Sequence, residues 1–394
     1  MTCRCLSFRA LATLLFTLTG LAVSHAQRTV DLTASDGTKL KASYFAAAKL
    51  GPGVLLLHQC NRQGRKVWDG LAQQLAAAGI SVLTLDYRGF GESGGEPFDK
   101  LPPERMAQIR AEKWPGDFDT AFQYLVSQPG VRRDMIGVGG ASCGVNNSVQ
   151  TARRHPEVKS LVLLSGNTDL NGREFLRHSA NVPVFFSVAD DDEFPPTVLA
   201  MEWLYSLTSD TRKRLVHYAT GGHGADMFAV HPELPGMIAD WYVSTLIKTP
   251  EGEPNTKDAP PIIPEVHVLD EIDQPGGAAK VGQLLEEGRK RYSKATLFSE
   301  AMVNLVGYDH IQSGDTKGAV EIMKLNVAAY PNSPNVYDSL SDAYLADGQK
   351  ELARQNAKRV LELLPSDTVD NEQRRNGIRA SAEQKLKQLG DAQQ

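Results

Sequence analysis

The chain has 394 residues and a formal net charge of −5 at pH 7. Its length suggests two domains, and its mildly acidic balance argues against a protein that binds nucleic acid. We therefore expect a small molecule or another protein as partner, and no nucleic acid.

The N-terminus has the features of a secretory signal. Arg4 and Arg9 form a positive segment, residues 10–23 are largely apolar, and Ser24-His25-Ala26 supplies small residues where a signal peptidase cleaves. The apolar run is shorter than the ~20 residues that cross a bilayer. Residues 1–26 are thus predicted to be a signal peptide, with an unprocessed anchor as the alternative. The mature protein would be periplasmic or extracellular, with no membrane span.

Removing this segment changes the composition in two ways. The chain loses two arginines, so its net charge becomes −7, and it loses two of its four cysteines. Cys60 and Cys143 then remain as one pair. In an exported protein a single remaining pair invites a disulfide.

The next part of the chain alternates strand and helix patterns. Residues 28–46 alternate apolar and polar side chains around Asp36-Gly37, which predicts a hairpin. Continuous apolar runs predict buried strands, and 3.6-residue periodicity predicts the helices between them. Such alternation indicates an α/β fold with a doubly wound, mostly parallel sheet. The expected strands are 53–57, 80–85, 135–138, 160–164, 184–189 and 214–218, and the expected helices are 68–78, 104–126 (interrupted near Trp114-Pro115), 145–154, 197–207 and 235–246.

The pattern changes after residue 247. Residues 248–275 hold six prolines in a polar stretch without periodicity, which is typical of a linker. Residues 276–394 are almost purely helical in pattern. The predicted organisation is therefore an α/β domain over 27–247, a linker over 248–275 and a small all-α domain over 276–394.

One glycine-rich corner lies between a predicted strand and a predicted helix. Gly140 and Gly144 stand two residues either side of Ser142, the G-x-S-x-G pattern of a nucleophile on a tight strand-to-helix turn. The turn would expose the serine hydroxyl and place the N–H of Cys143 at a helix N-terminus. Cys143 is a poorer nucleophile candidate, because its flanks at the same offset are not glycines. The alternative is a glycine-rich turn with a solvated serine.

A histidine and a carboxylate follow in the order Ser, Asp, His. His223 lies between glycines after the strand 214–218, on what we expect to be an exposed loop. The strand 184–189 ends in four consecutive acids, so the choice of carboxylate is ambiguous. A two-residue turn past Ala189 favours Asp191, with Asp190 and Asp192 facing away. Such an acid holds the tautomer of a histidine base.

The end of strand 53–57 is where a second oxyanion donor is expected. The N–H of Cys60, or less favourably of Gln59, would act together with that of Cys143. Two donors aimed at one oxygen lie within ~5–6 Å of each other. Their Cα atoms then fall near the separation that a disulfide tolerates. We therefore hypothesise a Cys60–Cys143 disulfide that locks the oxyanion hole. His58 is interpreted as a packing residue.

Five segments of the predicted α/β domain stand out as an ordered set: HQC (58–60), LDYRGFGES (85–93), GASCG (140–144), ADDDEFP (189–195) and GGHG (221–224). Together they resemble the α/β-hydrolase superfamily, most closely its dienelactone hydrolase-like branch, over about residues 28–247. The resemblance implies that Ser142 is the nucleophile, His223 the general base and then acid, and Asp191 the orienting carboxylate. It implies no metal and no organic cofactor. Dienelactone hydrolases carry cysteine where this chain has serine, so lactone specificity is not implied.

The C-terminal region carries an internal repeat. Gly314 and Gly348, Ala319 and Ala353, and Pro331 and Pro365 are each 34 residues apart. This is the tetratricopeptide period, and the region resembles that repeat, with capping helices expected at about 278–293 and 370–389. Two copies are fewer than the ~3 usually needed for independent stability. The region would bind a protein partner or self-associate, or it would stabilise the first domain.

The sequence therefore predicts an exported serine hydrolase of carboxylic esters or related acyl substrates. Residues 166–182 are too few for a large lid, which favours a small or flexible acyl substrate. Hydrolysis of amides or peptides is an alternative. A non-catalytic protein that keeps the hydrolase shell and binds through its repeats is another.

Overall fold

A computed structural model describes residues 27–61, 63–194, 196–248 and 263–390. Its centre is an eight-stranded sheet with the strand order β1-β2-β4-β3-β5-β6-β7-β8. β1 and β2 form the antiparallel hairpin predicted around Asp36-Gly37. The other six strands, β3 to β8, run parallel to one another, and β2 joins them through an antiparallel pairing with β4. The strands are β1 Gln27–Thr33, β2 Lys39–Phe45, β3 Gly51–Leu57, β4 Ser81–Leu85, β5 Val131–Ala141, β6 Val158–Leu164, β7 Val184–Ala189 and β8 Lys213–Tyr218.

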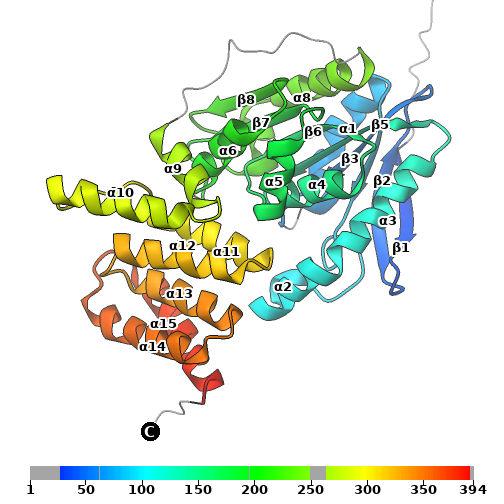
Figure 1. The fold of residues 1–394 in the computed structure, drawn as a ribbon. Coiled ribbons are helices and arrows are strands. Elements are labelled where there is room, and N and C mark those ends of the chain that lie inside the picture. The colour runs from blue at the N-terminus through cyan, green and yellow to red at the C-terminus, as the bar shows by residue number, and fades with distance from the viewer. Residues whose placement is uncertain (1–26, 62, 195, 249–262, 391–394) are drawn as a thin grey trace, which may run out of the picture.

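Helices cover both faces of this sheet (Figure 1). On one face α3, α4, α5 and α6 pack over a large apolar cluster that includes Phe122, Val149 and Leu204. On the other face α1, α8 and the π-helical turn after it enclose a second cluster around Leu75 and Tyr242. The helices are α1 Asp69–Ala77, α2 Pro103–Glu112, α3 Trp114–Ser127, α4 Cys143–Arg154, α5 Leu170–His178, α6 Pro196–Leu207, α7 Met227–Val230 and α8 Leu234–Tyr242, with the π-helical turn at Val243–Ile247.

This arrangement is the α/β-hydrolase fold, and it confirms the predicted fold class. The parallel strands β3, β5, β6, β7 and β8 end at one edge, and in such sheets ligands lie outside the carboxyl ends of the strands. The candidate residues at 58–60, 142, 190–192 and 223 follow β3, β5, β7 and β8 in turn. The fold therefore gathers them at one edge of the sheet.

The C-terminal region is all helical. The helices α11 and α13 begin at Glu300 and Pro334, and α12 and α14 begin at Thr316 and Lys350, so the second hairpin repeats the first after 34 residues. This spacing agrees with the internal repeat, while the assignment to the tetratricopeptide class stays a prediction. The helices are α9 Pro264–Ile272, α10 Gly277–Arg291, α11 Glu300–Gln312, α12 Thr316–Ala329, α13 Pro334–Ala346, α14 Lys350–Leu363 and α15 Glu372–Gln388.

The predicted linker over 248–275 is wrong in its last part. α9 forms within it, because Val266, Leu269 and Ile272 recur every three residues and are all buried. They share an apolar cluster with Ala200 and Trp203 of α6 and with α10, α11 and α12. The helical region therefore packs directly on the hydrolase domain (Figure 1). Residues 249–262 and the predicted signal peptide, 1–26, lie outside the described residues.

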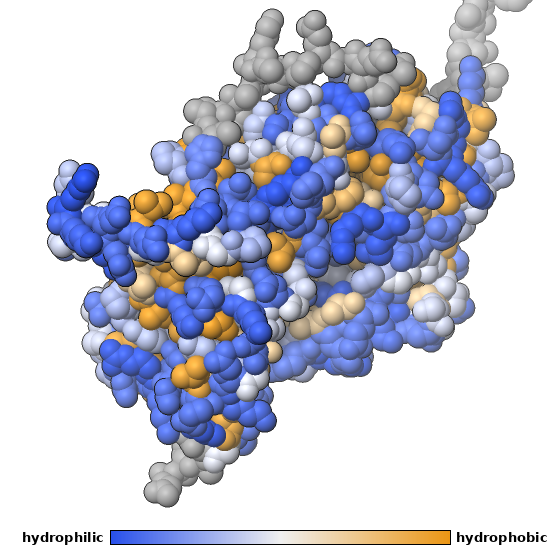
Figure 2. All heavy atoms as spheres, viewed as in Figure 1, coloured by the Kyte–Doolittle hydropathy of each residue, from blue (hydrophilic) through white to orange (hydrophobic). Residues whose placement is uncertain are grey.

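The outer surface is mostly polar. On the face shown in Figure 2, hydrophilic residues predominate and the apolar ones lie in several separate groups. Within the described ranges, no helix is both long and apolar enough to cross a membrane.

Candidate active site

Ser142 occupies the tight turn between β5 and α4. It has φ 55° and ψ −122°, one of two positive φ values among the non-glycine residues described. A side chain other than hydrogen does not fit on either side of it. A Cβ added at Gly140 would lie 2.0 Å from the Gly144 carbonyl oxygen, and one added at Gly144 would lie 2.4 Å from the Leu57 carbonyl oxygen. Both glycines of the G-x-S-x-G pattern are therefore required, because a larger side chain would clash with neighbouring backbone carbonyls.

A residue in this backbone region is strained by roughly 1–3 kcal/mol, and such strain gathers at functional sites. The surrounding structure holds the turn in place. The Ser142 N–H donates to the Leu164 carbonyl at 2.9 Å, and the Val145 N–H donates to the Ser142 carbonyl at 2.9 Å. The serine is thus held at the sheet edge on a fixed backbone.

His223 pairs with Asp192. Its Nδ1 lies 2.9 Å from Oδ1 and 2.8 Å from Oδ2 of the carboxylate. The side chain of Asp192 is inaccessible to solvent and that of His223 is 11% exposed, so the predicted exposed loop position of the histidine is wrong. Asp192 also accepts the Phe194 N–H at 2.9 Å, which fixes its orientation. A buried carboxylate on Nδ1 leaves Nε2 to act on a substrate or a nucleophile.

The assignment of Asp191 as the partner of His223 is therefore corrected to Asp192. The Asp192 N–H donates to the Ala189 carbonyl at 3.2 Å, which closes a turn with Asp190 and Asp191 in its middle. The Asp190 N–H still pairs with the β8 side, on the Tyr218 carbonyl at 2.9 Å. The chain thus leaves the sheet one residue later than expected, and the inward position falls on Asp192.

The other two aspartates have separate partners. Asp191 Oδ1 accepts the N–H groups of Gly221 and Gly222, each at 2.8 Å, and so supports the backbone that leads to His223. Asp190 Oδ1 lies 2.7 Å from Nε2 of His217. Each of the three aspartates therefore has a different partner, and only Asp192 contacts His223.

His223 Nε2 is buried and, among the residues that the structure describes, has no hydrogen-bond partner. The loop that carries it lies against the serine turn. A Cβ added at Gly224 would come within 3.3 Å of the Ala141 Cβ, one residue before Ser142. The histidine and the serine thus come from adjoining segments, with an imidazole nitrogen still available.

Gln59 links the loop after β3 to the histidine loop. Its Oε1 accepts the Ala225 N–H at 2.7 Å, and its Nε2 donates to Asp226 Oδ1 at 3.2 Å. The side chain is 3% exposed. The sequence pattern indicates Gln59 only as a possible backbone donor, and no motif marks the role of its side chain.

Cys60 and Cys143 form a disulfide with a Cα–Cα distance of 5.9 Å, as the sequence analysis hypothesised. The bond joins the loop after β3 to the first residue of α4. The N–H of Cys143 lies in the first turn of that helix, where it has no intrahelical acceptor. A helix N-terminus of this kind favours a negative charge.

His58 is a buried packing residue, as predicted. Its ring stacks on Tyr87 with a centroid distance of 3.8 Å, and Nε2 accepts the Tyr87 N–H at 3.1 Å. Nδ1 is then the donor to the Gln59 carbonyl at 2.6 Å. Burial lowers the pKa of His58 to about 4, despite the opposing hydrogen bond with Gln59. A neutral, fully paired ring has no free nitrogen for catalysis.

Comparison with known proteins relates part of the chain to the serine hydrolases. Residues 52–182 match the family model described as serine aminopeptidase, S33. The match contains Ser142 and both cysteines but ends before Asp192 and His223, and it covers about a third of the chain. The chain thus has a hydrolase-like α/β fold with a serine hydrolase family match around its serine turn.

Two curated relatives show how far sequence similarity extends. The thiohydrolase aneE of Aspergillus aculeatus is 28% identical over 133 residues, which cover 34% of this chain and 39% of that protein. An uncharacterized protein of Mycobacterium tuberculosis is 32% identical over 151 residues, covering 38% and 49% respectively. The chain spans less than half the length of either protein.

Solved structures of similar fold include an esterase of Pyrococcus furiosus, at 17% identity and a TM-score of 0.47, which covers 57% of this chain and 92% of its own. A dienelactone hydrolase of Anabaena variabilis is 19% identical with a TM-score of 0.44, covering 56% and 98%.

Proposed function

We propose that the protein is a serine hydrolase of carboxylic esters or related acyl substrates, with Ser142 as nucleophile, His223 as general base and Asp192 as the carboxylate that orients it. The observation that carries this proposal is the strained backbone of Ser142, on a turn that lies against the loop of a histidine whose Nδ1 is held by a buried carboxylate. Backbone strain of this kind gathers at functional sites, which supports a functional role for this serine.

In the first step the Ser142 hydroxyl oxygen attacks the acyl carbonyl carbon, and its proton passes to Nε2 of His223. Asp192 stabilises the resulting imidazolium through Nδ1–H. Collapse of the tetrahedral intermediate breaks the bond to the leaving group, which takes the proton from Nε2. Water then attacks the acyl-enzyme by the same route and releases the acid.

The oxyanion hole in this mechanism consists of the backbone N–H groups of Cys60 and Cys143. The disulfide between the two residues would hold these donors at a constant separation while negative charge develops on the carbonyl oxygen. Losing one such donor typically costs about 10²–10³ in turnover.

The test is a substrate panel on purified protein. p-Nitrophenyl acetate, an acyl thioester and a p-nitroanilide of the same acyl group would be compared by kcat/KM. We expect turnover of the ester, and its loss in Ser142→Ala with the fold retained by circular dichroism. Full turnover by the Ser142→Ala variant would overturn the proposal.

Hydrolysis of amides or peptides is the second candidate. The description of the matching family model, serine aminopeptidase, favours it. A thioester substrate has similar support in the name of the relative from Aspergillus aculeatus. The p-nitroanilide and thioester arms of the panel decide between them when each kcat/KM is divided by the uncatalysed hydrolysis rate of the same compound, because the activated ester is intrinsically the more reactive substrate.

We also propose that the mature protein begins after Ala26 and works outside the cytoplasm, where its disulfide would form. The intact mass of protein isolated from its source cell tests this.

For the helical region we propose a stabilising role or partner binding. A catalytically inactive binding protein remains the non-enzyme alternative, and absence of any covalent adduct with a fluorophosphonate would favour it.

A further inference from the structure

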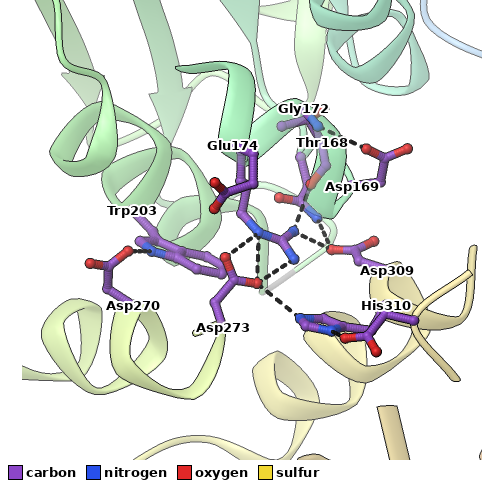
Figure 3. Close-up of polar contacts among 12 residues, drawn as sticks. Thr168, Asp169, Gly172, Glu174, Trp203, Asp270, Asp273, Asp309 and His310 are labelled. Atoms are coloured by element: carbon purple, nitrogen blue, oxygen red, sulfur yellow. Dashed lines mark hydrogen bonds and ion pairs between the residues drawn. The ribbon is translucent and has the colours of Figure 1, made fainter. Parts of the chain in front are cut away.

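A group of buried charges lies where the helical region meets the hydrolase domain (Figure 3). Arg173 of α5 is inaccessible to solvent, and its guanidinium contacts Asp273, which follows α9, at 2.7 Å and Asp309 of α11 at 2.7 Å. The guanidinium also lies over the ring of Trp203, 4.7 Å from the centroid. His310 Nε2 contacts Asp273 at 3.2 Å.

Asp309 extends this group to the edge of the sheet. Its Oδ2 accepts the Asn167 side-chain N–H at 2.8 Å as well as the Arg173 N–H. Arg173 in turn donates to the Thr168 carbonyl at 2.7 Å. One carboxylate of the helical region thus holds the loop that follows β6 directly at Asn167 and, through Arg173, at Thr168.

This loop lies directly against the serine turn. Leu164, the last residue of β6, accepts the Ser142 N–H at 2.9 Å. A Cβ added at Gly166 would lie 2.6 Å from the Ser142 carbonyl oxygen, so the two backbones are in close contact. Ser165 between them has φ 45°, the second positive φ value among the described non-glycine residues. A shift of this loop would therefore displace the backbone of Ser142.

The charges of this group are unfavourable to bury. Desolvation raises the pKa of Asp309 to about 6, against the opposing effect of Arg173. For Arg173, burial disfavours the charge, but Asp273 and Asp309 outweigh it and raise the pKa. Buried ion pairs are often no more stabilising than apolar residues of the same volume. We therefore interpret this group of charges as fixing the relative positions of α5, α9 and α11 more than as adding to the stability of the fold.

We propose that Asp309 of the helical region is a positioning residue for the nucleophile, acting through Asn167 and the loop 165–169. The helical region would then be part of the catalytic unit. This inference depends on the proposed role of Ser142, and it assigns to the C-terminal region a function in the hydrolase site itself.

The experiment uses the full chain and four variants. Asp309→Ala removes both contacts of the carboxylate, and Asn167→Ala removes the link from the hydrolase side while keeping the Arg173–Asp309 pair. Asp309→Asn keeps an oxygen that can accept the Asn167 N–H. Asp338→Ala is the matched control, because Asp338 is also a buried carboxylate of the helical region, paired with Lys385 at 2.9 Å.

Two measurements are made on each folded variant. Hydrogen exchange reports the protection of the loop 165–169. Labelling with a fluorophosphonate reports the affinity for the probe and the maximal rate of its attack by Ser142. A residue that only stabilises the fold would leave that maximal rate unchanged in the folded population.

For Asp309→Ala and Asn167→Ala we expect faster exchange in 165–169 and a maximal labelling rate about tenfold lower, with the affinity for the probe unchanged. Asp309→Asn is expected to recover most of the rate. Asp338→Ala should match the wild type in both measurements, whatever its loss of stability.

Unchanged exchange and labelling in Asp309→Ala and Asn167→Ala would overturn the inference, and so would equal effects in Asp338→Ala. If the wild-type protein takes no label at Ser142, the serine hydrolase proposal fails by itself. Hydrogen exchange then still tests the link between Asp309 and the loop 165–169 separately from the serine hydrolase proposal. Unchanged exchange in Asp309→Ala overturns this link, and faster exchange supports it.

Discussion

The three adjacent aspartates after β7 face different partners because of the turn that carries them. Asp190 lies beside His217, Asp191 holds two glycine N–H groups, and Asp192 contacts His223. All three are chemically identical, so their roles follow from position alone. The turn that Asp192 closes on Ala189 sets that position.

We predict that Asp192→Asn lowers kcat about 10⁴-fold, because an amide favours the wrong tautomer of His223. Asp190→Asn is the matched control two residues earlier in the same turn, and it should keep kcat within about threefold. Steady-state kinetics on an activated ester measures both. An equal loss in the two variants would contradict the assignment of Asp192.

The buried ring of His58 leads to a prediction on stability. Its pKa of about 4 in the folded protein lies below the unfolded value of 6.5, so the unfolded chain binds one more proton between these values. Stability from this group is present above pH 6.5 and is lost as the pH falls toward 4. Its contribution over that window is about 3 kcal/mol.

His58→Gln does not titrate, so its free energy of unfolding should fall less than that of the wild type between pH 7 and 4. Urea denaturation at several pH values measures the two slopes. Parallel curves would show that His58 is not held neutral by burial.

At the scale of elements, the disulfide joins the loop after β3 to the start of α4 across 83 residues of sequence. A bond of this kind constrains the unfolded chain, and its removal typically costs about 2–4 kcal/mol. In this fold it also ties together the two backbone segments proposed as oxyanion donors.

We predict that the double variant Cys60→Ser, Cys143→Ser is destabilised by about 2–4 kcal/mol and has a kcat lowered about tenfold in the protein that remains folded. Denaturation curves and kinetics on the same samples test both. A lower stability with an unchanged kcat would mean that the bond stabilises the fold without organising the oxyanion hole.

The sequence predicted the elements whose pattern is local. Alternation in 28–46 predicted the opening hairpin, and apolar runs predicted the buried strands. It did not predict α5, because the buried face of that helix carries Arg173, whose partners lie 100 and 136 residues further along the chain. α9 was missed because the neighbouring prolines obscured its buried residues.

The candidate site was likewise predictable where its signals are local in the sequence. The glycines around Ser142 and the order of the proposed triad residues are visible in the sequence, as is the pair Cys60 and Cys143. The choice among the aspartates and the side-chain role of Gln59 depend on loop geometry, which the sequence pattern does not encode.

At the scale of the whole molecule, the helical region is continuous with the hydrolase domain. Trp203 of α6 lies in one apolar cluster with α9, α10 and α11 and donates its indole N–H to Asp270 at 3.2 Å. On another side Gln384 of α15 contacts Glu104 of α2 at 2.9 Å. The helices α9 to α12 thus share part of their apolar core with the hydrolase domain, while the apolar clusters around α13, α14 and α15 are formed within the helical region.

Peptide mapping after reaction with a fluorophosphonate tests the assignment of Ser142 as the nucleophile. We predict one adduct, on Ser142, which is absent in Ser142→Ala and forms far more slowly in His223→Ala. An adduct on another residue, or none on folded wild-type protein, would contradict the assignment.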